Sequence, residues 1–346
     1  MLDSKQHVSS LDTKDMLRML DDLPKHLMDG IKVGRRVAPS KFRPSEVVVC
    51  GVGGSAIGGD LLCEWLSTLS EVPCQVSRSY SLPSSVGKKS LAVVASYSGN
   101  TEETLSMFGE ARRRKAKMVC VSSGGQLARM AARSKIPVAS VPSGMMPRAS
   151  LGYMLGAMIG VLERGEVLRA EGQVEDAVHA LREVVGASKS SVPTKDNPAK
   201  KMAHELFGTI PVIVGYDLSK PVAKRWANQF NENSKIIAFS SQLPEMNHNE
   251  IVGWMMDSKS RGFSAIFLDH GHSAPAMQRR VDATKRMYRR VAPVHSVRAL
   301  GSGPLAQMLS LLLFGDYVSV YLGLLGSEDP SSNEPIDELK VMLSKK

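Results

Sequence analysis

The feature of the sequence that most restricts the fold is a regular alternation of short β-branched segments with helical patterns. In the first half, the segments suited to buried strands are 46–50, 91–96, 118–122 and 138–141. Helical patterns follow them from the glycine cluster at 51–60 through Leu69, and then at 101–115, 126–135 and 149–162. Such alternation is typical of a parallel sheet covered by helices.

The alternation begins again in the second half, after a stretch at 186–200 that is rich in Ser, Pro and Lys and reads as a linker. Strands are expected at 211–215, 236–239, 263–268 and 294–297, and helices at 220–234, 276–290 and 304–326. We therefore expect an α/β protein of two doubly wound, flavodoxin-like parallel-sheet domains with a C-terminal helix. The expected limits are a helical lead at 1–30, domains at 31–165 and 201–346, and a helical connection and linker at 166–200.

The helix expected at 304–326 needs a separate assessment because it is long and apolar enough to span a bilayer. It carries Gln307, Asp316 and Ser319, polar residues that are unfavourable at that depth. The apolar segment 151–162 is too short to span. Both are expected to be core helices, and no membrane partner is expected.

The chain carries 44 Lys and Arg against 34 Asp and Glu, a formal net charge of +10, which favours anionic partners. The arginine-rich stretches 111–117 and 279–290 are not interleaved with aromatic residues, so no nucleic-acid partner is expected. The N-terminus lacks the pattern of a signal peptide. No CxxC pair joins the cysteines, which favours buried thiols and a cytoplasmic protein; they are Cys50, Cys63, Cys74 and Cys120.

The first glycine cluster, GVGGSAIGGD at 51–60, has two chemical interpretations. Gly51, Gly53 and Ala56 match a dinucleotide fingerprint, but Arg78 stands where a ribose-binding acid is expected about 20 residues on. In the second interpretation, Gly54 and Ser55 belong to a helix N-terminus whose N–H groups and hydroxyl surround an anion. A third possibility is that the glycines serve only a tight turn.

The second cluster, SYSGNTEET at 96–104, also lies where a strand ends and a helix begins. Ser96, Ser98 and Thr101 offer three hydroxyls beside Gly99 and free backbone donors. An ordinary N-cap at Thr101 is the plainer explanation. Three hydroxyls beside a glycine suit a phosphomonoester better, and together with Ser55 they can cradle a dianion without a metal.

The S-x-S-G-x-T segment at 96–101 resembles the phosphosugar-binding loop of sugar isomerase (SIS) domains. Four segments resemble, in order, the bifunctional phosphoglucose/phosphomannose isomerase family: GVGGSAIGGD, SYSGNTEET, PRASLGYMLG at 147–156 and NHNEIVGW at 247–254. The resemblance implies two SIS domains, a homodimer and no metal or cofactor. It also implies interconversion of fructose 6-phosphate with glucose 6-phosphate and mannose 6-phosphate through a cis-enediol.

The resemblance also implies roles for individual residues. Glu250 matches the base that moves a proton between C1 and C2, and Arg148 matches the arginine that stabilises the enediolate. Ring opening is assigned to a histidine, for which His272 is preferred to His270, and to Lys340. The His270–x–His272 pair also fits two zinc ligands, but no further cluster supplies a third and a fourth. The phosphate would bind to Gly54, Ser55, Ser96, Ser98 and Thr101.

One departure from the family concerns the segment ahead of Lys340. The family carries there a threonine that is linked to acceptance of both C2 epimers, whereas this chain has Ser331, Ser332 and Asn333. A serine can supply the hydroxyl, so activity toward mannose 6-phosphate stays an expectation. Two other functions stay open: a non-catalytic phosphosugar-binding regulator, and a nicotinamide-dependent oxidoreductase based on the glycine fingerprint.

Overall fold

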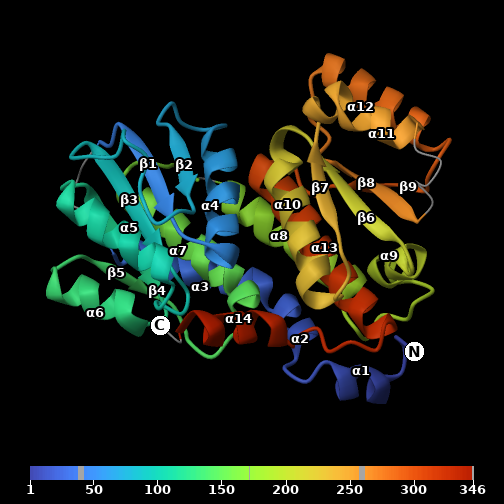
Figure 1. The fold of residues 1–346 in the computed structure, drawn as a ribbon, viewed down its shortest axis with the longest axis horizontal. Helices are drawn as coiled ribbons and strands as arrows, with labels where there is room; N and C mark the ends of the chain where they lie inside the picture. Colours follow the sequence, from blue (N-terminus) through green and yellow to red (C-terminus); the bar gives the residue numbers. More distant parts are fainter. Residues whose placement is uncertain (38–42, 171, 257–261, 345–346) are drawn as a thin grey trace. The chain divides into compact units, whose positions relative to one another are not determined.

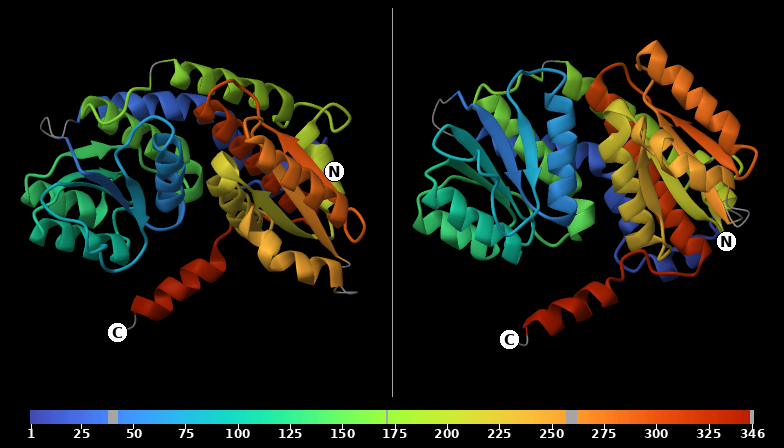
Figure 2. Two further views of the ribbon diagram at one scale, coloured as in Figure 1. Left: turned by 90° about the horizontal axis from the view of Figure 1, so that it is seen from above. Right: turned by 45° about the horizontal axis from the view of Figure 1, so that its top comes forward.

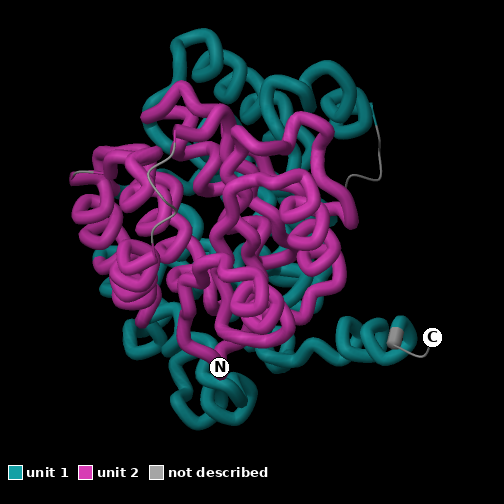
Figure 3. The backbone as a smooth tube through the Cα atoms, turned by 90° about the vertical axis from the view of Figure 1, so that its left-hand side faces the viewer, with its two compact units in different colours: residues 1–21, 183–300, 310–346 teal, residues 22–182, 301–309 magenta. Residues whose placement is uncertain are grey.

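The computed structural model describes residues 1–37, 43–170, 172–256 and 262–344. The chain forms two compact units (Figure 3). Unit 1 comprises residues 1–21, 183–300 and 310–346, and unit 2 comprises residues 22–182 and 301–309. Each unit is built on one parallel sheet with helices on both faces (Figure 1). The predicted α/β class with two parallel-sheet domains is confirmed.

Unit 2 contains a five-stranded sheet in the order β2-β1-β3-β4-β5, with every neighbouring pair parallel. Its strands are β1 (Glu46–Cys50), β2 (Cys74–Ser77), β3 (Ser90–Ala95), β4 (Lys117–Ser122) and β5 (Val138–Ser140). Its helices are α3 (Leu23–Arg35), α4 (Gly53–Leu66), α5 (Glu102–Arg113), α6 (Gly125–Arg133), the 3-10 turn η1 (Pro147–Ser150) and α7 (Leu151–Arg164). The order makes the sheet flavodoxin-like, with a topological switch point between β1 and β3.

The central strands β1 and β3 are almost completely buried, which explains their continuous apolar sequences EVVVC and SLAVVA. Helices α5 and α6 cover one face of the sheet, and α4 and α7 cover the other. Helix α3 lies against α7. Glycines allow the two backbones to touch, since a Cβ at Gly34 would lie 2.1 Å from the Ala157 carbonyl oxygen and one at Gly156 would lie 2.3 Å from that of Leu27. This contact therefore depends on residues without side chains.

Unit 1 contains a four-stranded parallel sheet in the order β7-β6-β8-β9. Its strands are β6 (Ile210–Gly215), β7 (Phe239–Gln242), β8 (Phe263–Asp269) and β9 (Val294–Arg298). Its helices and 3-10 turns are α1 (Lys5–Leu11), α2 (Met16–Asp21), α9 (Pro198–Leu206), η2 (Asp217–Ser219), α10 (Lys220–Asn233), η3 (Glu245–His248), α11 (Glu250–Met256), α12 (Pro275–Tyr288) and α14 (Glu334–Ser344). Helices α8 (Gln173–Ser188) and α13 (Pro304–Leu325) each contribute residues to both units.

A buried ion pair joins α10 to α13 in unit 1. Arg225 donates two hydrogen bonds to Asp316, from Nη2 to Oδ2 at 2.9 Å and from Nε to Oδ1 at 3.1 Å. Trp226 donates from Nε1 to the Leu311 carbonyl at 2.9 Å. These bonds explain how the polar Asp316 is accommodated in α13, because a buried carboxylate is tolerated when it is paired. The most apolar stretch of 18 residues in α13 is 89% buried. The prediction that α13 is a core helix is therefore confirmed.

One predicted strand is wrong in position. The strand expected at 236–239 is β7, which begins at Phe239, because the Asn231 side chain donates to the Ala238 carbonyl and so occupies a group that a neighbouring strand would use. The residues of the helical lead expected at 1–30 lie in the helices α1, α2 and α3. The Asp12 carboxylate accepts from the first N–H groups of α2, and Pro24 marks the start of α3.

The cysteines fall into two pairs. Cys50 and Cys120 are buried free thiols, as predicted, and burial raises the pKa of each to about 12. Cys63 and Cys74 form a disulfide, so the prediction that all four are thiols is wrong for this pair. The reason is tertiary: α4 packs on β2 and brings the two Cα atoms to 5.0 Å, a distance within the normal disulfide range.

Candidate functional site

The carboxyl ends of β1 and β3 in unit 2 carry both clusters predicted to bind phosphate. Strand β1 leads through Gly51 and Val52 into α4, and β3 leads through residues 96–101 into α5. A Cβ at Gly51 would lie 2.8 Å from the Ala95 carbonyl oxygen, so the two connections touch. Open α/β sheets bind their ligands at such a switch point, where neighbouring connections leave toward opposite faces.

Two helices begin at this switch point without side-chain caps. Neither Val52, the N-cap residue of α4, nor Thr101, the N-cap residue of α5, makes a side-chain hydrogen bond to its helix. Gly53 has a φ of +55°, and a Cβ there would meet nothing within 4 Å, so the first turn of α4 is accessible. Uncapped N–H groups at a helix start attract anions through hydrogen bonds and through the helix dipole.

The hydroxyls of the second cluster are arranged by the loop itself. Ser96 Oγ lies 3.0 Å from Thr101 Oγ1 and accepts a 3.1 Å hydrogen bond from the Gly99 N–H. Ser98 Oγ accepts from the Asn100 N–H at 3.3 Å. Ser96 is buried and Ser98 is exposed. Because Thr101 points toward Ser96 and not into its own helix, the plain N-cap explanation is not what the structure shows.

The glycine pair Gly124-Gly125 packs against this loop, and sequence reasoning missed its role. Gly99 has a φ of +67°, and a Cβ there would lie 1.9 Å from the Gly124 carbonyl oxygen, so only glycine fits. The Gly99 carbonyl accepts from the Leu127 N–H at 2.8 Å. The SSGG sequence at 122–125, between a strand and a helix, is the signal that could have identified it.

Arg148 lies in η1, directly against the start of α4. A Cβ at Gly54 would be 3.1 Å from the Pro147 carbonyl oxygen and 3.7 Å from the Arg148 Cα atom. Arg148 is 3% exposed. One end of unit 2 thus brings together all the predicted phosphate-binding residues and Arg148; they are Gly54, Ser55, Ser96, Ser98 and Thr101. Two helix starts, several hydroxyls and a buried guanidinium form an arrangement suited to an anion.

The switch point of unit 1, between β6 and β8, has a different chemistry. His270 follows β8 and is buried, with Nε2 3.1 Å from Ser273 Oγ and 3.6 Å from Asp217 Oδ2. Ser273 donates its hydroxyl proton to Asp217 at 2.9 Å. The hydroxyl has only one proton, so His270 Nε2 is the donor to Ser273 and Nδ1 is left as an acceptor. Burial lowers the pKa of His270, although the nearby Asp217 acts in the opposite direction. The lowered pKa favours the neutral ring.

Asp217 and Asp269 make this second switch point acidic, in contrast to the hydroxyls and glycines of unit 2. Tyr216 Oη donates to Asp269 Oδ1 at 3.4 Å, and its ring lies 5.2 Å from that of His270. Two carboxylates at this position disfavour a phosphate. Sequence reasoning missed Asp217 and Ser273; the DLS turn at 217–219 directly after a strand was the available signal.

The other predicted residues of unit 1 lie on three different elements. Glu250 is the first residue of α11, and its Oε2 atom accepts a 2.5 Å hydrogen bond from Ser241 Oγ at the end of β7. His272 is exposed in the connection between β8 and α12. Lys340 is exposed on α14, where Nζ pairs with Asp337 Oδ1 at 2.8 Å.

The fold and the hydroxyl-lined end of unit 2 are those of the sugar isomerase (SIS) class. A glucose-6-phosphate isomerase-like protein from Thermus thermophilus has the same fold, with a TM-score of 0.64 and 20% identity over 98% of each chain. The family model described as the bacterial phospho-glucose isomerase C-terminal SIS domain matches residues 195–343.

Curated relatives identify the family more narrowly. The bifunctional phosphoglucose/phosphomannose isomerase of Caldicellulosiruptor bescii is 35% identical over 342 residues, covering 95% of this chain and 99% of the relative. The protein of the same name from Aquifex aeolicus is 35% identical over 302 residues, covering 86% of this chain and 90% of the relative. The chain belongs to the bifunctional phosphoglucose/phosphomannose isomerase family. It is therefore an aldose–ketose isomerase.

Proposed function

We propose that the chain interconverts fructose 6-phosphate with glucose 6-phosphate and mannose 6-phosphate through a cis-enediol. The observation that carries this proposal is the uncapped, hydroxyl-lined switch point between β1 and β3, which suits a phosphomonoester. The names of the curated relatives agree with it. The hydroxyls and N–H groups of the loop can hold the dianion without a metal.

Proton transfer is assigned to Glu250 and charge stabilisation to Arg148. A base must carry a proton between C1 and C2 of the open-chain sugar, and the hydrogen bond from Ser241 holds the Glu250 carboxylate in one orientation for that task. Arg148 bears a permanent positive charge and is buried, so it can stabilise the developing enediolate strongly.

Ring opening is assigned to His272 and Lys340, and His270 is given a positioning role. Opening a hemiacetal requires a proton donor and acceptor at the ring oxygen and O1, so the groups must reach the sugar. His272 is exposed, whereas the buried His270 is held by Ser273 and Asp217. His270 would then orient the turn that carries His272.

Activity toward mannose 6-phosphate is assigned to Ser332 in place of the family's threonine. Ser331 is buried; its hydroxyl donates to Asp329 Oδ1 at 2.6 Å and lies 3.1 Å from Thr13 Oγ1. Ser331 is therefore occupied in holding its own segment. The Ser332 hydroxyl makes no hydrogen bond within the described ranges of the chain, so it is the serine available to a sugar hydroxyl.

The active protein is proposed to be a cytoplasmic homodimer without nucleic-acid or membrane partners. Helix α14 extends from the rest of unit 1 (Figure 2) and exposes apolar side chains along its length. Ile336, Lys340 and Leu343 are spaced i, i+4, i+7 and share one face of it. Packing of this face on a second copy would cover the apolar residues and place Lys340 at the contact. The domain limits 1–30, 31–165, 166–200 and 201–346 remain a prediction.

A coupled assay tests the proposed reaction directly. Purified chain is given fructose 6-phosphate, and glucose 6-phosphate is detected with an auxiliary dehydrogenase; mannose 6-phosphate is tested as a second substrate. Turnover with both epimers is expected. Tight sugar-phosphate binding without turnover would favour a regulator instead, and a nicotinamide-dependent absorbance change without the auxiliary enzyme would favour an oxidoreductase.

A further inference from the structure

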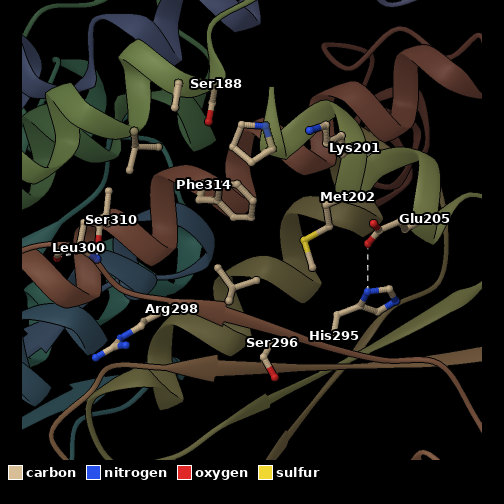
Figure 4. A pocket seen from close by; sticks show the side chains of 14 residues that line it. Ser188, Lys201, Met202, Glu205, His295, Ser296, Arg298, Leu300, Ser310 and Phe314 are labelled. Carbon is tan, nitrogen blue, oxygen red and sulfur yellow. Dashed lines mark hydrogen bonds and ion pairs between the residues drawn. The ribbon is translucent and has the colours of Figure 1, made fainter. Parts of the chain in front are cut away.

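Unit 1 contains a cavity of about 470 Å³ beside strand β9 (Figure 4). Four successive residues of β9, 295–298, line it together with residues of α8, α9 and α13. Because successive strand residues point to opposite faces, lining by all four places the cavity at the free edge of β9. Its volume falls within the range of small-molecule sites.

The difference between the two sheets explains why this space exists. In unit 2 a fifth strand, β5, follows α6 and pairs with β4. In unit 1 the chain passes from β9 to α13, and in the described part of the chain no strand pairs with the outer edge of β9. The cavity beside β9 in unit 1 thus corresponds to the position that β5 takes beside β4 in unit 2.

The outer edge of β9 offers backbone donors to this cavity. The bonds from the Ala265 N–H to Pro293 and from the Ala299 N–H to Asp269 show that the odd-numbered residues bond to β8. In a parallel ladder the alternate residues then face away, so the N–H groups of Ser296 and Arg298 point to the edge. N–H groups in this position can bind an anionic oxygen.

The interior of the cavity is mainly apolar. Phe314 and Val297 are half-buried and Met202 and Val184 are buried, so a ligand there would contact an aromatic ring and several aliphatic groups. A flat apolar body fits such a lining better than a sugar does, because a sugar's hydroxyls would be left without partners.

The rim carries positive charge without acidic partners. Lys201 and Arg298 are exposed and line the cavity, and neither makes an ion pair within residues 1–37, 43–170, 172–256 and 262–344. Glu205 on the same rim is occupied, since its Oε2 atom lies 3.2 Å from Nδ1 of His295 (Figure 4). An anionic group on a ligand would therefore be attracted to this rim.

We propose that this cavity is a binding site for a small aromatic anion, a flat apolar body that carries one acidic group. The acidic group binds to Lys201, Arg298 and the edge N–H groups of β9, and the body packs on Phe314 and Met202. The site is separate from the switch points of both sheets, and it does not rest on the proposed isomerase reaction.

The test is a binding titration of the full-length chain with 8-anilinonaphthalene-1-sulfonate, followed by fluorescence and by calorimetry. We expect saturable binding of one probe per chain. N-phenyl-1-naphthylamine, which is the same body without the sulfonate, is expected to bind about tenfold more weakly because it lacks the charge. Excess fructose 6-phosphate should not displace the sulfonate probe.

Two variants localise the binding. Ala187→Phe places a ring into the cavity from an exposed position on α8, and the double change Lys201→Glu with Arg298→Glu reverses the rim charge. Each is expected to weaken binding of the sulfonate probe about tenfold or more. The matched control is Lys195→Glu with Arg286→Glu, which changes the net charge equally at residues outside the cavity and should keep the affinity within about twofold.

The proposal is overturned by unsaturable binding, by equal losses in the rim and control variants, or by displacement with fructose 6-phosphate. It is also overturned if Ala187→Phe, shown by circular dichroism to be folded, binds like the wild type. If Ala187→Phe does not fold, the rim double variant, which alters only exposed side chains, decides the outcome.

Discussion

Ser241 donates a 2.5 Å hydrogen bond to the Oε2 atom of Glu250. The serine lies near the end of strand β7 and the glutamate begins helix α11, so the carboxylate is held from a rigid element. Hydrogen bonds to a carboxylate are short and strong, and they fix its orientation. This contact makes Glu250 a well-positioned candidate for the base that transfers the proton.

Glu250→Gln is expected to lower kcat for fructose 6-phosphate isomerisation by about 10³-fold and to leave KM nearly unchanged, because the amide cannot accept the proton. Ser241→Ala should lower kcat by about tenfold, since the carboxylate loses its orientation. Steady-state kinetics in the coupled assay measure both. The exposed Glu175→Gln is the control and should behave like the wild type; near-native turnover in Glu250→Gln would refute the base assignment.

The double change Ser98→Ala with Thr101→Ala is expected to raise KM by about tenfold or more with little change in kcat. Phosphate contacts are nearly equal in the ground state and the transition state, so their loss weakens binding of both. Ser106→Ala on helix α5, which follows the loop, is the matched control; the Ser106 hydroxyl donates to the Tyr80 carbonyl. A fall in kcat alone would show that the loop is not a simple phosphate anchor.

Ser332→Ala is expected to lower the ratio of mannose 6-phosphate to glucose 6-phosphate turnover, because a hydroxyl proposed to contact the sugar is removed. Ser332→Thr should retain the ratio, since it keeps the hydroxyl. Parallel assays with the two epimers give the ratio for each variant. An unchanged ratio in Ser332→Ala would contradict the assignment of epimer acceptance to this side chain.

His270→Asn is expected to flatten the dependence of stability on pH. Burial lowers the pKa of His270 in the folded chain below the ordinary value of 6.5, so the unfolded chain binds the proton more readily. The free energy of unfolding of the wild type should therefore decrease as the pH falls below about 6.5. Urea titrations at about pH 7.5 and 5.0 measure this, and an equal decrease in His270→Asn would contradict the buried, neutral state.

Gly156→Ala is expected to lower the free energy of unfolding by about 1–3 kcal/mol, because the new methyl group conflicts with the Leu27 carbonyl of α3. Gly186→Ala is the matched control on α8, where a Cβ meets nothing within 4 Å. It should raise the free energy of unfolding by about 0.5–1 kcal/mol through helix propensity alone. Denaturant titrations compare the two, and a stabilised Gly156→Ala would show that α3 can move away.

The sequence predicted those features that depend on neighbours along the chain. Periodicity placed β1, β3 and the helices after them, because the burial of a strand or of a helix face requires apolar residues at a fixed spacing. The glycine and hydroxyl clusters were correctly expected at strand-to-helix turns, since only such residues suit these turns. The start of β7 at Phe239 was missed because the Ala238 carbonyl before it is bonded by Asn231, several residues away.

For the candidate site, too, only those features that lie within one continuous segment could be predicted. The candidate residues of unit 2 could be selected from the sequence because SYSGNTEET and GVGGSAIGGD each form one continuous segment. Asp217 and Ser273 were missed because they are separated by 56 residues from each other and meet only when β6 pairs with β8. The Cys63–Cys74 disulfide was missed for the same reason, as α4 must first pack on β2.

Local order along the chain was thus determined by the sequence alone: the α/β class, the two sheets, and the loops at the ends of β1 and β3. Only the tertiary structure decided which side chains meet across the fold. Thr13 lies beside Ser331 although 318 residues separate them, and β9 is left with an open edge beside a cavity. The physical reason is that such contacts depend on the packing of whole elements, and no periodicity in the sequence encodes that packing.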